Sequence, residues 1–242
     1  MPYRRLPNTD SSRLKALQKA LQKSEGVPPF NLSFSVSTHQ ELKFFYPEFL
    51  QATNYQKETL DRQTEKNSKH QESLKKARLY ISHFIQVLNF AILRGDLKSE
   101  TRNIFDLDSY GNKLPQLNTE NDIIKWGKKL IDGEQKRLVK GYAPITNPSI
   151  ARVKVHYEDY LRIHISQKHL QQTHNKALQN MTQLREKADD IIVKIWNEVE
   201  EHYSNLPTNE KRINAETFGV VYVHRRNEKI SFSNLKLEKT VL

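Results

Sequence analysis

The feature that most constrains this chain is a segment from Glu48 to Arg94 without a single glycine or proline. Proline breaks helices, and sheet-rich folds need both residue types at frequent turns. The segment therefore predicts one long helix, over residues 38–94, which Gly95 ends. Pro47 lies inside the same pattern, and it predicts either a kink or the true start of this helix.

A second long helix is predicted over residues 147–204. Asn147 is a favourable capping residue, and Pro148 suits the first helical position, so the two together are a strong start signal. The other predicted elements are shorter: helices over 10–23 and 119–140, a strand or extended arm over 30–36, an irregular segment over 95–118, and a small β-hairpin over 218–235.

The two long helices show an internal similarity. A shift of 111 residues places Tyr46 on Tyr157 and Ile81 on Ile192. This agreement favours a duplication with repeat halves 10–94 and 119–204. The alternative is that any two amphipathic helices can be slid into some agreement.

These elements predict a mainly α fold in a single elongated helical domain, residues 1–242, with the small β-hairpin near its C-terminus. Only seven glycines and nine prolines occur in 242 residues, which favours helices over sheets. The long return segment between the two long helices predicts that they pack side by side and antiparallel, as a helical bundle with coiled-coil character.

Polar residues interrupt the apolar seam in the middle of both long helices. Gln63, Asn67 and His70 occupy it in the first helix, and Gln171 and His174 in the second. We expect the first three to lie close to the other two, because polar seam residues fix the register of paired helices. The alternative is that the first helix breaks near Asn67 and these side chains face water.

No sequence motif indicates a catalytic, metal or cofactor site. The chain has no cysteine, which excludes disulfides and thiolate metal sites. It also lacks a phosphate-binding glycine loop, a nucleophile elbow and the Glu-x-x-His pair of di-metal bundles. The nine histidines include no pair with i/i+4 spacing, so we interpret those in the long helices as polar seam residues. We expect no cofactor and no metal.

The leading functional prediction is a non-catalytic interaction or scaffold protein, located in the cytoplasm, that binds a protein partner or forms a homodimer. An enzyme whose site is assembled from distant residues is one alternative. A nucleic-acid-binding protein is another, because the formal net charge is +11. That charge is spread thinly, which disfavours nucleic acid. The candidate contacts are the basic residues near the termini: Arg4, Arg5, Lys15, Lys19, Lys23, Arg225 and Arg226. No segment is apolar enough to predict a membrane span.

Overall fold

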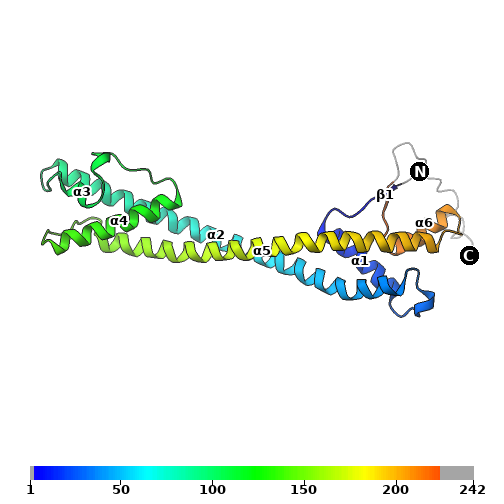
Figure 1. Cartoon of the computed structure of the whole chain (residues 1–242). Helices are drawn as coiled ribbons and strands as arrows, with labels where there is room; N and C mark the ends of the chain where they lie inside the picture. Colours follow the sequence, from blue (N-terminus) through cyan, green and yellow to red (C-terminus); the bar gives the residue numbers. More distant parts are fainter. Residues whose placement is uncertain (1–2, 224–242) are drawn as a thin grey trace, which may run out of the picture. The chain divides into compact units, whose positions relative to one another are not determined.

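The computed structural model describes residues 3–223 and divides the chain into two compact units. Unit 1 comprises Met1–Lys57 and Lys176–Leu242, and unit 2 comprises Glu58–Asn175. Two long helices, α2 (Val36–Leu93) and α5 (Ile150–His202), contribute one end to each unit (Figure 1). The predicted mainly α fold with two long helices is therefore confirmed.

Unit 1 surrounds its part of α2 and α5 with α1 (Asp10–Ser24) and α6 (Thr208–Thr217). Thr9 caps α1 by accepting a hydrogen bond from the Ser12 amide. The core of this unit contains residues from all four helices: Leu17 of α1, Leu42, Phe45 and Phe49 of α2, Ile192, Ile195 and Trp196 of α5, and Ala215 of α6. Burial of these apolar surfaces is the main force that stabilises the unit.

In unit 1, the first turn of α2 is held by a carboxylate from α5. Glu198 accepts hydrogen bonds from the Ser35 amide at 2.7 Å and from the Thr38 hydroxyl at 2.9 Å. A negative charge is favourable at a helix N-terminus, where amides lack partners. Ser35 also caps the helix locally, because its hydroxyl accepts a hydrogen bond from the Thr38 amide at 3.3 Å. One turn later, Glu41 contacts Lys194 of α5 at 3.3 Å.

Unit 2 contains α3 (Thr101–Ile104), α4 (Glu120–Val139) and the other ends of α2 and α5. Thr119 and Asp122 form a reciprocal capping box at the start of α4. The core again joins several helices: Ile81, Phe84 and Leu88 of α2, Ile123, Trp126 and Leu130 of α4, and Val153, Tyr157 and Tyr160 of α5.

The segments of α2 and α5 are antiparallel in both units. In unit 2, Thr59 pairs with His174 at 3.1 Å, and further along α2 the ring of His70 stacks on that of His164. In unit 1, Thr38 pairs with Glu198, and the later Glu41 pairs with the earlier Lys194. Rising residue numbers in α2 thus meet falling numbers in α5, as predicted.

Several boundaries differ from the sequence-based prediction. Helix α2 runs through Pro47 and Asn67 without interruption, so the alternative of a break near Asn67 is wrong. Residues 30–36 do not form a strand, because a 3₁₀ turn occupies Pro29–Asn31 and α2 already begins at Val36. The peptide bond between Asn147 and Pro148 is cis, and α5 begins at Ile150.

A two-stranded antiparallel sheet lies near the C-terminus, as expected. Its strands are β1 (Tyr3–Arg4) and β2 (Tyr222–Val223), so the partner of the C-terminal strand comes from the other end of the chain. Residues 224–235 of the predicted hairpin lie outside the described residues. Helix α6 was not predicted. Among residues 3–223, no helix combines the length and apolarity that a membrane crossing requires.

Candidate metal centre

Three helices of unit 2 bring two imidazoles and one carboxylate together. The Nε2 atom of His70 in α2 lies 3.4 Å from one carboxylate oxygen of Glu120. The Nδ1 atom of His164 in α5 lies 3.4 Å from the other oxygen. One potential ligand atom from each residue lies within 4.8 Å of the others, so a single ion could contact all three.

Both imidazoles are buried and incompletely paired. His70 is 4% exposed and His164 is 5% exposed. The Nε2 atoms of both rings have no hydrogen-bond partner among the described residues, since the 3.4 Å contact of His70 lacks hydrogen-bond geometry. Buried polar atoms normally have partners, so unpaired ones indicate either a ligand or internal water.

Local structure fixes the three side chains. Glu120 is the first residue of α4, and the Thr119 capping box holds this helix start in place. The rings of His70 and His164 lie 5.7 Å apart between centroids, with 26° between their planes, where α2 packs on α5. Tyr160, one turn before His164, contacts Nδ1 of that ring through its hydroxyl at 3.4 Å. The geometry therefore depends on three separate helices rather than on one flexible loop.

The environment favours neutral imidazole at His164. Burial is the largest cause that lowers the pKa of His164, and Lys168 and His70 act in the same direction. Glu120 opposes this shift. Burial also raises the pKa of Tyr160, so its hydroxyl stays protonated near neutral pH. Neutral imidazole is the form that binds metal ions.

A polar cavity of about 220 Å³ adjoins the two histidines and Glu120. Gln63, Gln167 and Lys168 contribute to its lining. The side-chain oxygens of both glutamines are buried without a hydrogen-bond partner among the described residues. These oxygens can accept hydrogen bonds from a water molecule, including one bound to a metal ion.

The distances suit a tetrahedral ion. Zinc–nitrogen and zinc–oxygen bonds of about 2.1 Å place neighbouring ligands of a tetrahedron roughly 3.4 Å apart. Each imidazole has this separation from a different oxygen of Glu120, so one tetrahedral ion bound to both rings would require the carboxylate to turn a single oxygen toward them. Two histidines and one carboxylate are also the protein ligands of many zinc and non-haem iron sites with an open position.

The five predicted seam residues differ in burial. His70 and His174 are buried, Gln63 is half-buried, and Asn67 and Gln171 are exposed. All except His174 line the polar cavity.

Gln171 lines the same cavity as Gln63, Asn67 and His70, so the expected pairing along the seam needs a correction only for His174. The side-chain amide of Gln167 donates a hydrogen bond to the backbone carbonyl of Gln63 at 3.4 Å. His174 lies against Thr59 rather than beside Asn67 and His70. The register differs because apolar residues of α2, α4 and α5 pack together in the core of unit 2, and this packing determines how far α5 slides along α2.

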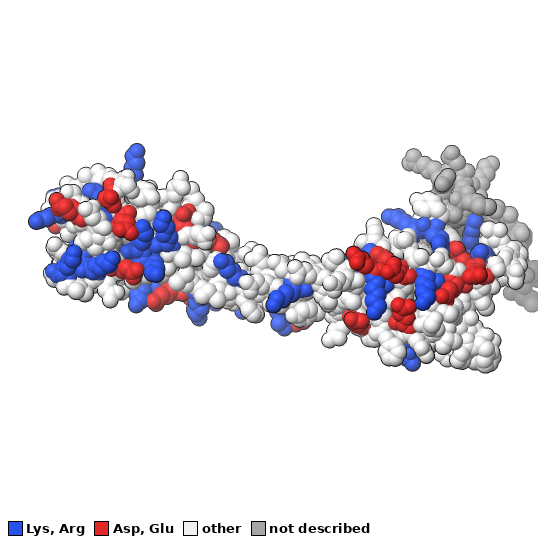
Figure 2. Space-filling model, viewed as in Figure 1, with Lys and Arg blue, Asp and Glu red and all other residues white. Residues whose placement is uncertain are grey.

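The predicted nucleic-acid contacts lie in unit 1. Arg5, Lys15 and Lys19 line one pocket, whereas Lys23 is exposed outside it. Arg4 instead donates a hydrogen bond to Asn197 of α5. Arg225 and Arg226 lie outside the described residues. Figure 2 shows acidic and basic side chains interleaved on the visible face of each unit, rather than one continuous basic surface.

Sequence reasoning missed the His70–Glu120–His164 cluster because it searched for ligand spacing within single helices. His164 and Gln167 lie on the same seam of the second long helix as Gln171 and His174. This position is the sequence feature that could have predicted their burial. Glu120 carries no such signal, since an acidic residue in the first helical turn is common for dipole reasons alone. Its proximity to the histidines follows from the packing of α4.

Comparisons with known proteins provide no family for this chain. No protein-family model, no curated protein and no solved structure matches it.

Proposed function

We propose that this chain is a helical protein that binds a divalent transition-metal ion through His70, Glu120 and His164. The observation that carries the proposal is the placement of both imidazoles 3.4 Å from the two oxygens of a single carboxylate. The unpaired Nε2 atom of His70 faces Glu120, and its burial costs free energy unless a ligand or water satisfies it. In His164 the nitrogen that faces Glu120 is Nδ1, so an ion there would leave the unpaired Nε2 atom to water.

The ligand chemistry favours borderline ions. The chain offers no thiolate, and a set of two nitrogens and a carboxylate suits Zn²⁺ or Fe²⁺ better than Ca²⁺ or Mg²⁺, which prefer oxygen ligands. Three protein ligands leave a coordination position for water or a substrate, on the side of the polar cavity.

The ion would join α2, α4 and α5 of unit 2. Metal binding then stabilises the folded unit by mass action, because the ligands are apart in the unfolded chain. This role agrees with the interaction or scaffold function expected from the sequence, in which a helical frame presents surfaces to a partner. Hydrolytic chemistry at the open position is the catalytic alternative.

Isothermal titration calorimetry of the metal-free chain with zinc tests the proposal. We expect one ion per chain, and a melting temperature that rises with zinc concentration. His164→Gln and Glu120→Gln should each weaken binding by at least about tenfold, as loss of one ligand does. The matched control is His169→Gln, which removes an exposed histidine from the same helix as His164.

The competing explanation is a water-filled polar cluster without metal affinity. Water needs two to four polar partners, and the glutamine oxygens and imidazole nitrogens provide them. Zinc binding that is absent, or that His169→Gln weakens as much as His164→Gln does, would contradict the metal centre and favour this explanation.

Self-association is a second candidate function, and two exposed aromatic residues of unit 1 favour it. Phe30 is 84% exposed and Phe44 is 78% exposed. Sedimentation velocity over a range of concentrations should show a dimer for the wild-type chain and a monomer for Phe44→Ser. A monomeric wild-type chain at every concentration would count against a homodimer.

We also infer that the two halves arose by duplication. Under the shift of 111 residues, Phe49 corresponds to Tyr160 and Ile81 to Ile192, and all four are buried. A shared burial pattern supports common ancestry better than shared composition does. Homologous sequences in which the 111-residue equivalence disappears would contradict the duplication.

A further inference from the structure

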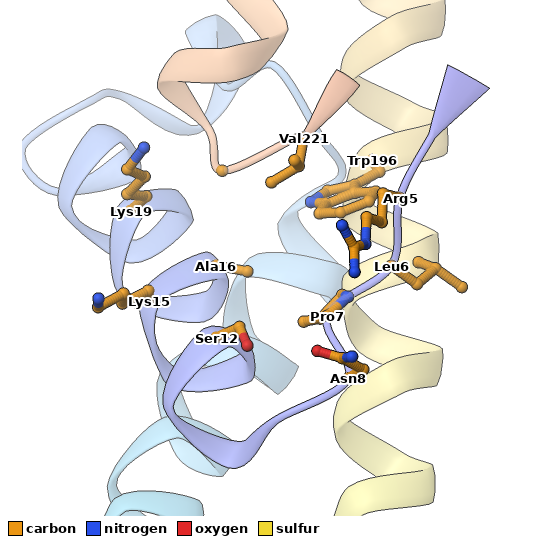
Figure 3. A pocket seen from close by; sticks show the side chains of 11 residues that line it. Arg5, Leu6, Pro7, Asn8, Ser12, Lys15, Ala16, Lys19, Trp196 and Val221 are labelled. Atoms are coloured by element: carbon orange, nitrogen blue, oxygen red, sulfur yellow. The ribbon is translucent and has the colours of Figure 1, made fainter. Parts of the chain in front are cut away.

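The N-terminal arm of unit 1 forms one side of a pocket of about 350 Å³ (Figure 3). The backbone amide of Arg5 donates a hydrogen bond to the carbonyl of Val221 at 2.9 Å, next to the β1–β2 pair. This bond holds the arm opposite α1. The pocket volume falls within the range of small-molecule sites, roughly 300–1,000 Å³.

The inner surface of the pocket is apolar and closely packed. Trp196 of α5 is 1% exposed and Ala16 of α1 is 6% exposed, and both contribute to the lining. Gly219 approaches α1 so closely that a Cβ atom there would lie 2.9 Å from the Ala16 carbonyl oxygen. The φ angle of Gly219 is +93°, which also favours glycine. Backbone packing therefore defines this wall.

The rim of the pocket carries three positive charges. Figure 3 shows Arg5 beside Trp196 on one side, with Lys15 and Lys19 of α1 on the other. None of the three cations has an ion-pair partner within residues 3–223, and no carboxylate lines the pocket. Arg13, in the same helix, is in contrast paired with Asp189 at 2.8 Å.

We propose that this pocket binds a small organic anion, in which a carboxylate or phosphate is attached to an aromatic or other apolar body. The apolar lining accepts the body, and the cations at the rim attract the charged group. The three residues were candidates for nucleic-acid contact from the sequence. Their position around one half-open apolar pocket favours a small ligand over a nucleic-acid backbone, which needs an extended basic surface.

Calorimetric titration with three naphthalene probes tests the proposal in the full chain. The probes 1-naphthoate and 1-naphthyl phosphate have the apolar body and an anionic group, whereas 1-naphthol has the body alone. We expect both anions to bind at least about tenfold more tightly than 1-naphthol. Titrations in the presence of EDTA keep this result independent of the metal centre.

Variants identify the pocket. Lys19→Gln and Arg5→Gln should each weaken binding of the two anions on the order of threefold to fivefold, as expected for partly screened charges. Lys23→Gln is the matched control, since it makes the same change in α1 outside the pocket. Val221→Glu places a carboxylate at an exposed lining position and should abolish binding. Circular dichroism verifies that each variant is folded.

Three results would overturn the proposal. The first is the absence of binding by either anion, and the second is equal binding of 1-naphthol and the anions. The third is an affinity for single-stranded oligonucleotides that rises with their length and falls in Lys19→Gln and Arg5→Gln, which would assign these cations to a nucleic-acid surface instead.

Discussion

The ring of Tyr157 in α5 lies directly over Gly127 in α4, and a Cβ atom at Gly127 would be 2.2 Å from the Cδ2 atom of that ring. Tyr157 also donates a hydrogen bond from its hydroxyl to the carbonyl of Ile124 at 3.0 Å. The two helices thus approach closely at a position where only glycine fits.

The substitution Gly127→Ala tests whether the contact with Tyr157 or helix propensity dominates the free energy of unfolding. Propensity alone predicts that alanine stabilises α4 by about 1 kcal/mol. The contact predicts the opposite sign, a loss of about 1–3 kcal/mol in the free energy of unfolding, because the tyrosine ring must move. Urea denaturation measures the difference. Lys128→Ala, an exposed change in the same helix, should leave stability almost unaltered, and a stabilised Gly127→Ala variant would disprove the close packing.

This glycine shows where sequence reasoning reaches its limit. When α4 is considered alone, a glycine inside it indicates a weakened helix. Gly127 is instead required because the ring of Tyr157 in α5 occupies the space that a side chain would fill. Helix type, the two long helices and a helix that begins near residue 119 could be predicted, because they depend on residues near in sequence. Helix register could not, because it depends on core packing between residues roughly a hundred positions apart.

The same limit applies to the candidate metal centre. The polar seam of each long helix was visible in the sequence, and burial of His70 and His174 agrees with a seam. The third group, Glu120, reaches the histidines only because α4 folds back along α2 and α5. Because the three candidate ligands come from three different helices, no regular spacing within one helix indicates them in the sequence.

Acid should weaken unit 1 through Asp10. Both of its carboxylate oxygens accept hydrogen bonds at 2.7 Å from Arg185, and these bonds are the largest cause that lowers the pKa of Asp10. A carboxyl group whose pKa is lower in the folded state adds stability above its unfolded pKa of about 3.9, and this stability is lost as the pH falls through the folded value.

Asp10→Asn should therefore lower the free energy of unfolding at pH 7 by about 1–2 kcal/mol. The difference from the wild-type chain should shrink below about pH 4, where Asp10 becomes protonated first in the unfolded chain and, at lower pH, in the folded chain. Thermal unfolding from pH 3 to 7 measures both effects. Glu25→Gln, an exposed change just after α1, is the control and should show neither. A deficit of Asp10→Asn that is constant over this range would contradict the ionic explanation.

A buried ion pair in unit 2 holds the segment after α4. Arg137 and Glu134 are 1% and 0% exposed, and they contact each other at 2.7 Å. Glu134 also accepts a hydrogen bond from the Ile145 amide at 2.8 Å, and Arg137 donates one to the Ala143 carbonyl at 3.2 Å. The pair thereby fixes the turn that connects α4 to α5.

Glu134→Leu should cost about 3–5 kcal/mol, because it leaves a buried guanidinium without a counter-charge. The double variant Glu134→Leu/Arg137→Met should recover a large part of this loss, since an apolar pair of similar volume avoids the desolvation penalty. A double-mutant cycle from urea denaturation measures the coupling. Additive losses from the two substitutions would mean that the pair contributes no interaction energy.

The polar seam of unit 2 can be tested by comparing a buried position with an exposed one, because its members differ in burial. His174 is 9% exposed and pairs with Thr59, which is 5% exposed, whereas Asn67 is exposed. The double variant Thr59→Val/His174→Leu replaces a buried polar pair by apolar side chains and adds buried apolar surface. We expect a melting temperature above that of the wild-type chain, together with a gain of about 1 kcal/mol in the free energy of unfolding.

Asn67→Leu adds an apolar side chain that stays in water, so it should leave the melting temperature unchanged and increase self-association. Differential scanning calorimetry and light scattering distinguish these outcomes. A double variant less stable than the wild-type chain would show that the Thr59–His174 pair stabilises the fold more than apolar packing would, and stabilisation by Asn67→Leu would place Asn67 in a buried seam.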